Sequence, residues 1–136
     1  MTVQGIPELK AALDKMVGKV NEASLRIITR SQAVAEAAVK AQFTGHHKKG
    51  EPTTSKSGKP PDVVTGTLRR SVISERPTMN GLVAHGRVYP TMVYARIQEL
   101  GGRGLPARPY VHPGYLASLP AISKISTEEW GIATGH

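Results

Sequence analysis

The side chains best suited to hold a metal ion in this chain are histidines, and two of them are adjacent. His46 and His47 lie in a polar segment, and His112 and His136 follow far downstream. Adjacent histidines point in different directions on most backbones, and no carboxylate or cysteine stands at ligand spacing around this pair. We therefore expect solvated loop histidines and no metal site. The chain has no cysteine, which excludes disulfides and thiolate ligands.

Patterns for acid–base or nucleophilic catalysis are also missing from the sequence. General acid–base catalysis usually needs two carboxylates held together, whereas the two aspartates, Asp14 and Asp62, are far apart in the chain. Ser71 has no nearby histidine–acid pattern, and no Gly-x-Ser-x-Gly sequence occurs. The glycine-rich residues 101–104 match neither a phosphate-binding loop nor a dinucleotide fingerprint. The sequence thus predicts no catalytic residue and no cofactor, and we expect a protein that is not an enzyme.

Positive charge is concentrated in the middle of the chain. The formal net charge is +8, and residues 44–112 hold four lysines and seven arginines against four acids, a balance of +7. Such a region suits DNA, RNA, anionic lipid or an acidic protein surface, or it serves solubility and pairing between subunits. Both readings stay open. The candidates for facing a polyanion or a neighbouring ring are Lys48, Lys49, Lys56, Lys59 and Arg103.

Three other arginines have expected roles in the fold. Arg69 and Arg70 are predicted to open a strand, so their side chains would point to opposite faces of a sheet. Arg108 precedes Pro109, which favours an extended backbone at that position. In this conformation the guanidinium of Arg108 could form a fork-like pair with a carboxylate such as Glu99. We expect Arg108 and Glu99 to act in the fold more than in binding.

One domain with a small aliphatic core must position these residues. The chain has 136 residues, of which 39% are hydrophobic and only 4% aromatic, so we expect a thin core. Apolar residues recur at three-, four- and seven-residue steps from Leu9 to Ala38, which predicts an amphipathic helix over residues 7–43. A helix of roughly 55 Å cannot be covered by so small a chain. Part of it should therefore contact another subunit.

A loop and a small sheet follow this helix in the prediction. Residues 44–62 are polar and rich in glycine, proline and lysine, so we expect a flexible basic loop. Residues 63–112 are expected to form an antiparallel sheet with a short helix. Its strands are predicted at residues 68–76, 82–89 and 108–112, with a turn at residues 77–81 that contains the hairpin signal Asn80-Gly81.

Two further helices complete the expected domain. A short helix at residues 92–100 is capped by Gly101. A C-terminal helix at residues 113–133 is interrupted or kinked by Pro120. The residues of this helix expected to face inward are Leu116, Leu119, Ile122 and Ile125. No apolar run approaches the roughly 20 residues of a membrane span, and the N-terminal residues lack the pattern of a signal peptide.

Three short motifs stand in a fixed order in the middle of the chain. The residues of the first are Thr65, Gly66, Leu68, Arg69, Arg70 and Ser71. The residues of the second are Tyr94, Ala95, Glu99 and Gly101. The residues of the third are Arg108, Pro109, Tyr110 and Pro113. Their order and spacing resemble the tail-completion, or neck, proteins of long-tailed bacteriophages, also described as minor tail components. The chain departs from the usual pattern of that family at Gly102, Tyr110 and Pro120.

This resemblance implies an α+β fold, with a long N-terminal helix and a C-terminal helix packed on a small twisted antiparallel sheet. It implies a homo-oligomeric, hexameric ring at the joint between phage head and tail, assembled in the host cytoplasm and retained in the virion. The implied partners are the adjacent connector or head-completion ring, the tail-terminator or tail-tube proteins and the genomic double-stranded DNA that passes through. No membrane is implied.

Two alternatives remain open at this stage. A tail-terminator ring has a similar architecture, and the sequence discriminates poorly between the two. A nucleic-acid-binding protein that acts outside any ring is supported by the sequence pI of about 10.1. Few aromatic residues are present to stack on bases, and no helix-turn-helix spacing occurs. We therefore favour the tail-completion role.

Overall fold

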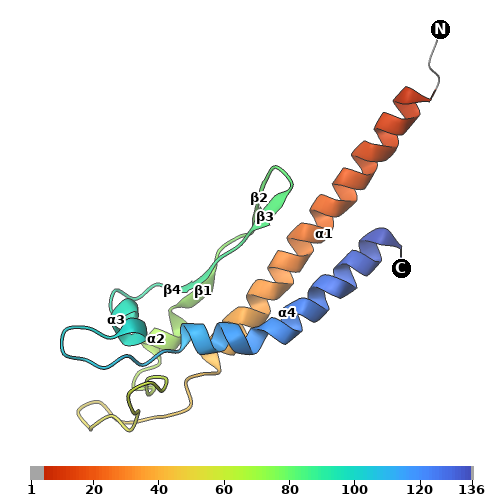
Figure 1. Ribbon diagram of the computed structural model, residues 1–136. Coiled ribbons are helices and arrows are strands. Elements are labelled where there is room, and N and C mark those ends of the chain that lie inside the picture. The colour runs from red at the N-terminus through yellow and green to blue at the C-terminus, as the bar shows by residue number, and fades with distance from the viewer. Residues whose placement is uncertain (1–4, 136) are drawn as a thin grey trace.

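The computed structural model describes residues 5–135, in which two long antiparallel helices pack together and a narrow β ribbon contacts the first of them (Figure 1). The long helices are α1 (Ile6–Lys40) and α4 (Val111–Thr134), and the short ones are α2 (Thr67–Arg70) and α3 (Ala95–Leu100). The strands are β1 (Val72–Ser74), β2 (Thr78–Asn80), β3 (Val83–His85) and β4 (Val88–Pro90). The predicted α+β class, with a long helix at each end and antiparallel strands between, is confirmed. His136 lies outside the described residues.

Helix α1 begins where the sequence predicts and ends three residues earlier. Pro7 occupies its first turn, where a missing N–H costs no helical hydrogen bond, and Glu8 complements the positive helix end. The helix stops at Lys40, and Phe43 is buried beyond it against Tyr110, with 4.9 Å between the ring centroids. The chain thus leaves the helix where an aromatic side chain enters the core.

Helices α3 and α4 also differ from their predicted bounds. Helix α3 begins at Ala95 rather than residue 92, and it ends before Gly101 as predicted. Helix α4 begins two residues before Pro113, so this proline lies in the first turn, where its missing N–H is tolerated. The helix runs through Pro120 as one element, and this proline is exposed.

The strands form one two-stranded ribbon, built of two paired segments, rather than a wider sheet. β1 pairs with β4 and β2 with β3, both antiparallel, and between these pairs the Glu75 N–H donates to the Arg87 carbonyl at 2.9 Å. At the same point Nε2 of Gln32 on α1 donates to the carbonyls of both Glu75 and Arg87, at 2.9 Å each. Gly86 permits this approach, because a Cβ there would lie 2.6 Å from Cδ of Gln32. Gln32 therefore fastens the ribbon to α1.

The hairpin turn is tighter than predicted. Asn80, expected within the turn, pairs with Val83, which leaves Gly81 and Leu82 as a two-residue connection. Gly81 has a φ of 61°, the positive value that tight hairpin turns require. The predicted strand at residues 82–89 is divided into β3 and β4 by Gly86 and Arg87, where the side chain of Gln32 contacts the ribbon.

Helix α4 packs on α1 through two small residues and through Ile125, which is buried as predicted, rather than through its leucines. Its buried residues are Gly114, Ser118, Ile125 and Glu129. Leu116 and Leu119, expected inward, are 49% and 39% exposed. A Cβ at Gly114 would lie only 2.5 Å from Cα of Val39, so the two helix backbones approach closely at this point. Close approach needs small side chains at the contact, and this turns the leucines outward.

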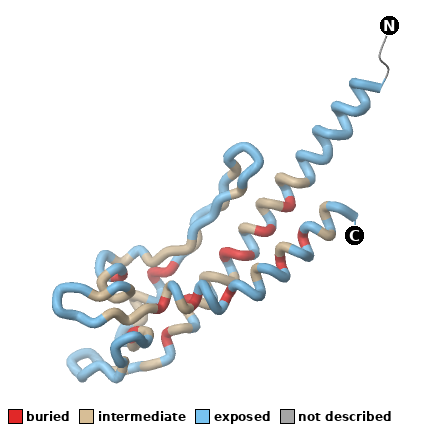
Figure 2. Tube along the Cα trace, in the orientation of Figure 1, coloured by how far each residue is buried: buried red, intermediate tan, exposed pale blue. Residues whose placement is uncertain are grey.

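The hydrophobic core is small, as the composition predicts. Val39, Phe43, Val72 and Tyr110 form its buried cluster, with Val63, Leu68, Val88 and Val111 packed around them. Buried residues recur along the C-terminal part of α1, whereas its N-terminal part is exposed (Figure 2). The core thus holds the end of the molecule where α1 finishes and α4 starts.

A buried carboxylate joins the two long helices farther along. Glu129 of α4 accepts hydrogen bonds from Nε of Arg26 at 2.7 Å and from Nη1 of Arg30 at 3.0 Å. These hydrogen bonds, first that of Arg26 and then that of Arg30, lower the pKa of Glu129 below its ordinary value, against the opposing effect of burial. Two arginines of α1 and one glutamate of α4 are thereby linked where the two helices pack together.

We predict that acid selectively removes this contribution to stability. Because the folded-state pKa of Glu129 is lowered, its contribution is present above the ordinary glutamate pKa of about 4.3 and is lost as pH falls through the lower folded value. Glu129→Gln should therefore be less stable than the parent at pH 7, and the difference should vanish in acid. Urea unfolding at a series of pH values measures it, and a constant difference at all pH values would contradict the assignment.

Candidate functional site

The three sequence motifs meet at one end of the helix pair, and Glu99 joins the last two. Its Oε2 accepts the backbone N–H groups of Tyr110 at 2.8 Å and Val111 at 2.9 Å, and its Oε1 accepts that of His112 at 3.0 Å. Tyr110, the residue at the N-cap position of α4, provides no side-chain cap. A carboxylate from α3 thus satisfies amides that a helix start leaves unpaired, and it complements the helix dipole.

The predicted pairing of Arg108 with Glu99 is wrong. The backbone N–H of Arg108 donates to the carbonyl of Gln98 at 2.7 Å, while its Nε is buried with no hydrogen-bond partner among residues 5–135. The expected strand at residues 108–112 does not form, since α4 already begins at Val111. The carboxylate of Glu99, which we expected to pair with Arg108, instead accepts the backbone N–H groups at the start of α4.

Tyr110 of the third motif is a core residue. It is fully buried beside Phe43, and its hydroxyl has no partner among the described residues. Burial raises the pKa of this hydroxyl, with a smaller effect from the charge of Glu99. Gly101 lets the loop before Tyr110 close, because its φ is 76° and a Cβ there would lie 2.9 Å from the backbone nitrogen of Ala107. Pro109 is half-buried next to it.

The first motif forms a turn of helix where a strand start is predicted. Gly66 has a φ of 76° and precedes the one-turn helix α2. Leu68 packs against the core, and the hydroxyl of Ser71 donates to its carbonyl at 2.6 Å. Arg69 and Arg70 therefore lie in a helix, exposed to solvent, and do not alternate across a sheet. The strand starts only at residue 72.

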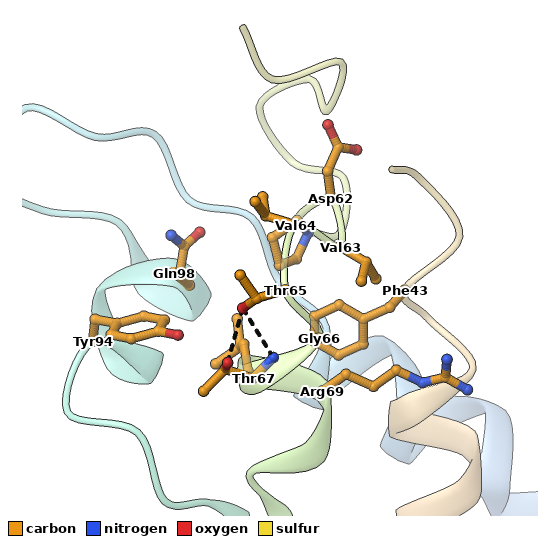
Figure 3. A pocket seen from close by; sticks show the side chains of 12 residues that line it. Phe43, Asp62, Val63, Val64, Thr65, Gly66, Thr67, Arg69, Tyr94 and Gln98 are labelled. Atoms are coloured by element: carbon orange, nitrogen blue, oxygen red, sulfur yellow. Dashed lines mark hydrogen bonds between the residues drawn. The ribbon is translucent and has the colours of Figure 1, made fainter. Parts of the chain in front are cut away.

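A small pocket lies between the first and second motifs (Figure 3). Its volume is about 140 Å³, and its lining includes Thr65, Tyr94 and Phe43. The hydroxyls of Thr65 and Thr67 are 2.8 Å apart at its edge. Sites for substrates and cofactors usually measure about 300–1,000 Å³, so this pocket suits packing at a junction. Ala95, at the start of α3, is buried nearby in the same motif as Tyr94.

The candidate cations lie on two loops at the same end of the molecule. All five, Lys48, Lys49, Lys56, Lys59 and Arg103, are exposed. The loops containing them lie together at the end of the molecule opposite the start of α1 and the end of α4 (Figure 1). The N–H of Gly58 donates to the carbonyl of Ala107 at 2.8 Å and links the loops. We call these five residues the basic end.

Arg103 stands in a strained turn. It has a φ of 51° and Gly104 has a φ of 78°, while Gly102 and Leu105 exchange backbone hydrogen bonds of 3.1 and 2.9 Å. Positive φ at both central residues is the type I′ hairpin geometry, which favours asparagine and glycine. A side chain other than glycine costs about 1 kcal/mol or more in this region. This strain makes Arg103 the strongest single candidate for contact with a partner.

Asp62 organises the loop that carries the lysines, which the sequence reading missed. Its Oδ2 accepts the backbone N–H of Thr54 at 2.7 Å, the hydroxyls of Thr53 at 3.0 Å and Thr54 at 2.9 Å, and the N–H of Ser55 at 3.1 Å. Nδ1 of His47 lies 3.0 Å from the same oxygen. Residues 44–62 are thus not uniformly flexible. The signal in the sequence was the run of threonine and serine at residues 53–55, followed by an aspartate that comes directly after two prolines.

The environment of Asp62 favours its charged form. Its side chain is only 3% exposed, and this burial raises the pKa, but the hydrogen bonds from Thr54, Thr53 and His47 outweigh it. The pKa of Asp62 therefore lies well below its ordinary value. Above pH 4 the carboxylate is ionised and able to hold the loop.

We predict that Asp62→Asn opens the loop without unfolding the two long helices. The contacts of Asp62 with threonine, serine and histidine all converge on Oδ2, and a neutral amide oxygen in its place lacks the negative charge that holds so many partners around one atom. Limited trypsin digestion should cleave the variant faster after Lys48, Lys49 and Lys56, whereas Lys59 is protected in any state by Pro60. Far-ultraviolet circular dichroism should stay unchanged. Glu51→Gln is the matched control, because Glu51 is exposed in the same loop and its amide could still accept the one hydrogen bond that Glu51 makes with its side chain, from the Lys48 N–H. Equal cleavage of both variants would contradict the role of Asp62.

Apart from the adjacent pair His46 and His47, the histidines among residues 5–135 lie in separate segments of the chain. The expected solvated state is wrong for His47, which is only 16% exposed because it pairs with Asp62, whereas His46 and His112 are exposed in separate segments. Within residues 5–135, no group of three or more histidine, aspartate or glutamate side chains is arranged to hold a metal ion. Among the helices of the same residues, none combines the length and apolar character that a membrane span requires.

A stripe of apolar side chains on the N-terminal part of α1 is uncovered. Its residues are Ile6, Leu9, Leu13, Met16 and Val17, each between 43% and 59% exposed. We call these five residues the α1 stripe. They recur at three- and four-residue steps, so they share one helix face. This part of α1 extends beyond the end of α4 (Figure 1).

Comparisons with models of protein families, with curated proteins and with solved structures gave no match. The features of the chain that bear on its function are therefore the three motifs, the basic end and the α1 stripe.

Proposed function

We propose that this protein is a structural component of a bacteriophage virion, which forms a homo-oligomeric ring at the head–tail joint. The ring joins a head-side connector ring to the tail, and genomic double-stranded DNA passes through its centre. The proposal has its origin in the resemblance of residues 65–71, 94–101 and 107–113 to tail-completion proteins. The α1 stripe is the structural observation that carries it.

The α1 stripe supports self-association because its exposure costs free energy. Fully burying a large aliphatic side chain contributes about 1.5–3 kcal/mol, so covering five half-exposed ones contributes on the order of 5 kcal/mol. Contiguous apolar patches of this kind usually mark interaction sites. Helix α4 packs against the C-terminal part of α1, and it ends before it reaches the stripe. A second subunit is the simplest cover.

The three motifs support a mechanical role. Glu99, Tyr110 and Gly101 lock the start of α4 onto α3 and the end of α1. These contacts connect the long helices to the loops of the basic end. Such a connection suits a subunit that adapts the surface of one ring to that of the next.

Mass photometry and negative-stain electron microscopy of the purified protein test the ring. We expect one closed oligomer, with six subunits as the family resemblance implies. A protein that stays monomeric at all concentrations would contradict the proposal. The tail-terminator alternative shares the ring, and the position of the ring in the virion separates the two.

The basic end supports a contact with the phosphates of DNA that does not depend on base sequence. Its cations are exposed and lack the interleaved aromatic residues that stack on bases. The basic end is also the observation that favours the second candidate function, which is nucleic-acid binding outside any ring. That alternative predicts strong DNA binding by a monomer, whereas the ring proposal assigns DNA contact to the assembled oligomer.

We predict that removing the four loop lysines weakens the salt dependence of DNA binding. Each phosphate contact contributes about 0.9 to the slope of log affinity against log salt concentration, so Lys→Gln at residues 48, 49, 56 and 59 should reduce the slope by up to about 3.6. Fluorescence anisotropy with duplex DNA at several salt concentrations measures this. Lys→Gln at residues 10, 15 and 19 of α1, away from the basic end, is the control. Identical slopes for both variants and the parent would contradict a DNA-facing basic end.

A further inference from the structure

An apolar groove lies between the middle of α1 and α4, where the β ribbon crosses. It is a hollow of about 500 Å³, and none of its lining residues is charged. The helices contribute Ile27, Ile28, Ala35, Tyr115, Ile122 and Ser126 to its lining. Gly86 and Val88 of the ribbon line its third side. A groove bordered by two helices and a ribbon has the form that accepts one amphipathic helix.

The groove also contains an unsatisfied polar group. Ser31 lies in its lining and is 9% exposed, and its hydroxyl has no hydrogen-bond partner among residues 5–135. A buried hydroxyl without a partner is unfavourable. The groove is therefore incomplete in the isolated chain, both in apolar contact and in hydrogen bonding.

The α1 stripe continues the face of α1 that is already packed. From Leu13 and Met16 the same three- and four-residue steps lead through Val20 to the buried residues Ala23 and Ile27. Ile27 contributes to the groove as well. The surface of each chain thus carries a projecting apolar helix and, farther along the same face, a hollow lined by apolar side chains.

We propose that the α1 stripe of one subunit docks into the groove of the next. This inference rests on the proposed homo-oligomer and specifies the two surfaces that meet. Different surfaces on the two partners make a head-to-tail contact, which closes into a ring when the rotation permits. A two-fold contact of stripe against stripe would leave every groove empty.

A chain cannot fill its own groove with its own stripe. Leu13 and Ile28 belong to one continuous helix and are 15 residues apart, about 22 Å at 1.5 Å per residue. The stripe therefore projects away from the groove of its own chain. Only another copy can bring the two surfaces together.

The apolar surface involved approaches that of a stable interface. The five half-exposed side chains form an apolar face comparable with the patches of roughly 300–600 Å² that often mark functional surfaces on monomers. A standard-size interface buries about 800 Å² on each partner. Polar residues flanking the stripe on the same helix supply the remainder.

Cysteine cross-linking tests the pairing directly, because the chain has no cysteine of its own. Leu9, Leu13 or Met16 is replaced by cysteine, each combined with Ile122→Cys or Ser126→Cys in one chain. After mild oxidation, we expect at least one double variant to form a ladder of covalent oligomers on non-reducing gels. The corresponding single variants should stay uncross-linked. Lys15→Cys with Ser126→Cys is the control, since Lys15 lies on the opposite side of the same turn as Leu13.

Three results would overturn the inference in different ways. Covalent dimers from Leu13→Cys alone would mean a two-fold contact between stripes. An oligomeric parent with no cross-link in any double variant would mean that other surfaces form the ring, and the proposed function would survive. A parent that mass photometry finds only as a monomer would remove the proposed function together with this interface.

Discussion

Replacing Glu99 with alanine should lower the free energy of unfolding by about 3 kcal/mol. Glu99 accepts three backbone N–H groups, from Tyr110, Val111 and His112, at 2.8–3.0 Å. Hydrogen bonds to a charged group contribute about 1.5–3 kcal/mol each, and a negative charge at a helix N-terminus adds a few tenths to 1 kcal/mol. Part of this loss is recovered because water can reach the exposed amide of His112. Urea unfolding followed by circular dichroism measures the change.

Two further variants give this prediction its controls. Glu99→Gln keeps one acceptor oxygen, so its loss should fall between those of the parent and the alanine variant. Glu128→Ala removes another helix carboxylate, one that is 43% exposed and paired only with Arg30 at the surface, and it should cost less than about 1 kcal/mol. A Glu99→Ala variant as stable as Glu128→Ala would show that the cap contributes little.

Adding a single methyl group at Gly114 should lower the free energy of unfolding by about 3 kcal/mol, at the upper end of overpacking effects. The new Cβ would lie 2.5 Å from Cα and 2.8 Å from the backbone nitrogen of Val39. Backbone atoms cannot rotate away as a side chain can, so α4 must move off α1 and loosen the core cluster beside it. Gly114→Val should be more damaging than Gly114→Ala. Thermal and urea unfolding measure both.

Gly18 provides the matched control, because it is also a helical glycine. A Cβ at Gly18 would meet nothing within 4 Å. Gly18→Ala should therefore raise the free energy of unfolding by up to about 1 kcal/mol through helix propensity alone. Opposite signs for the same substitution in two helices identify close packing as the cause. A mild effect at Gly114 would mean that α1 and α4 do not approach as closely as described.

The long helix and the α+β class could be predicted because their signals are local and repeated. The periodic stripe that begins at Leu9 predicts α1, and glycine and proline signals mark the hairpin and the end of α3. The length of α1 against the size of the chain also predicts uncovered helix surface. The structure has this surface in the α1 stripe, within residues 6–17.

The errors occur where one side chain acts on a distant segment. Residues 108–112 resemble a strand by composition, but Glu99 supplies the cap that starts a helix there. The inward face of α4 is set by Gly114 against Val39, so apolar spacing alone selected the wrong leucines. Asp62 likewise orders a polar loop through contacts up to 15 residues away. Local periodicity contains no information on such contacts.

Cryo-electron microscopy of the virion is the most direct test of the central claim. The proposed function predicts that virions of a long-tailed phage encoding this chain contain a ring of its subunits between the connector and the tail tube. Each subunit should fit the antiparallel α1–α4 pair, with the basic end turned to the DNA or to the adjacent ring. Mature virions in which no density fits this fold would contradict the account.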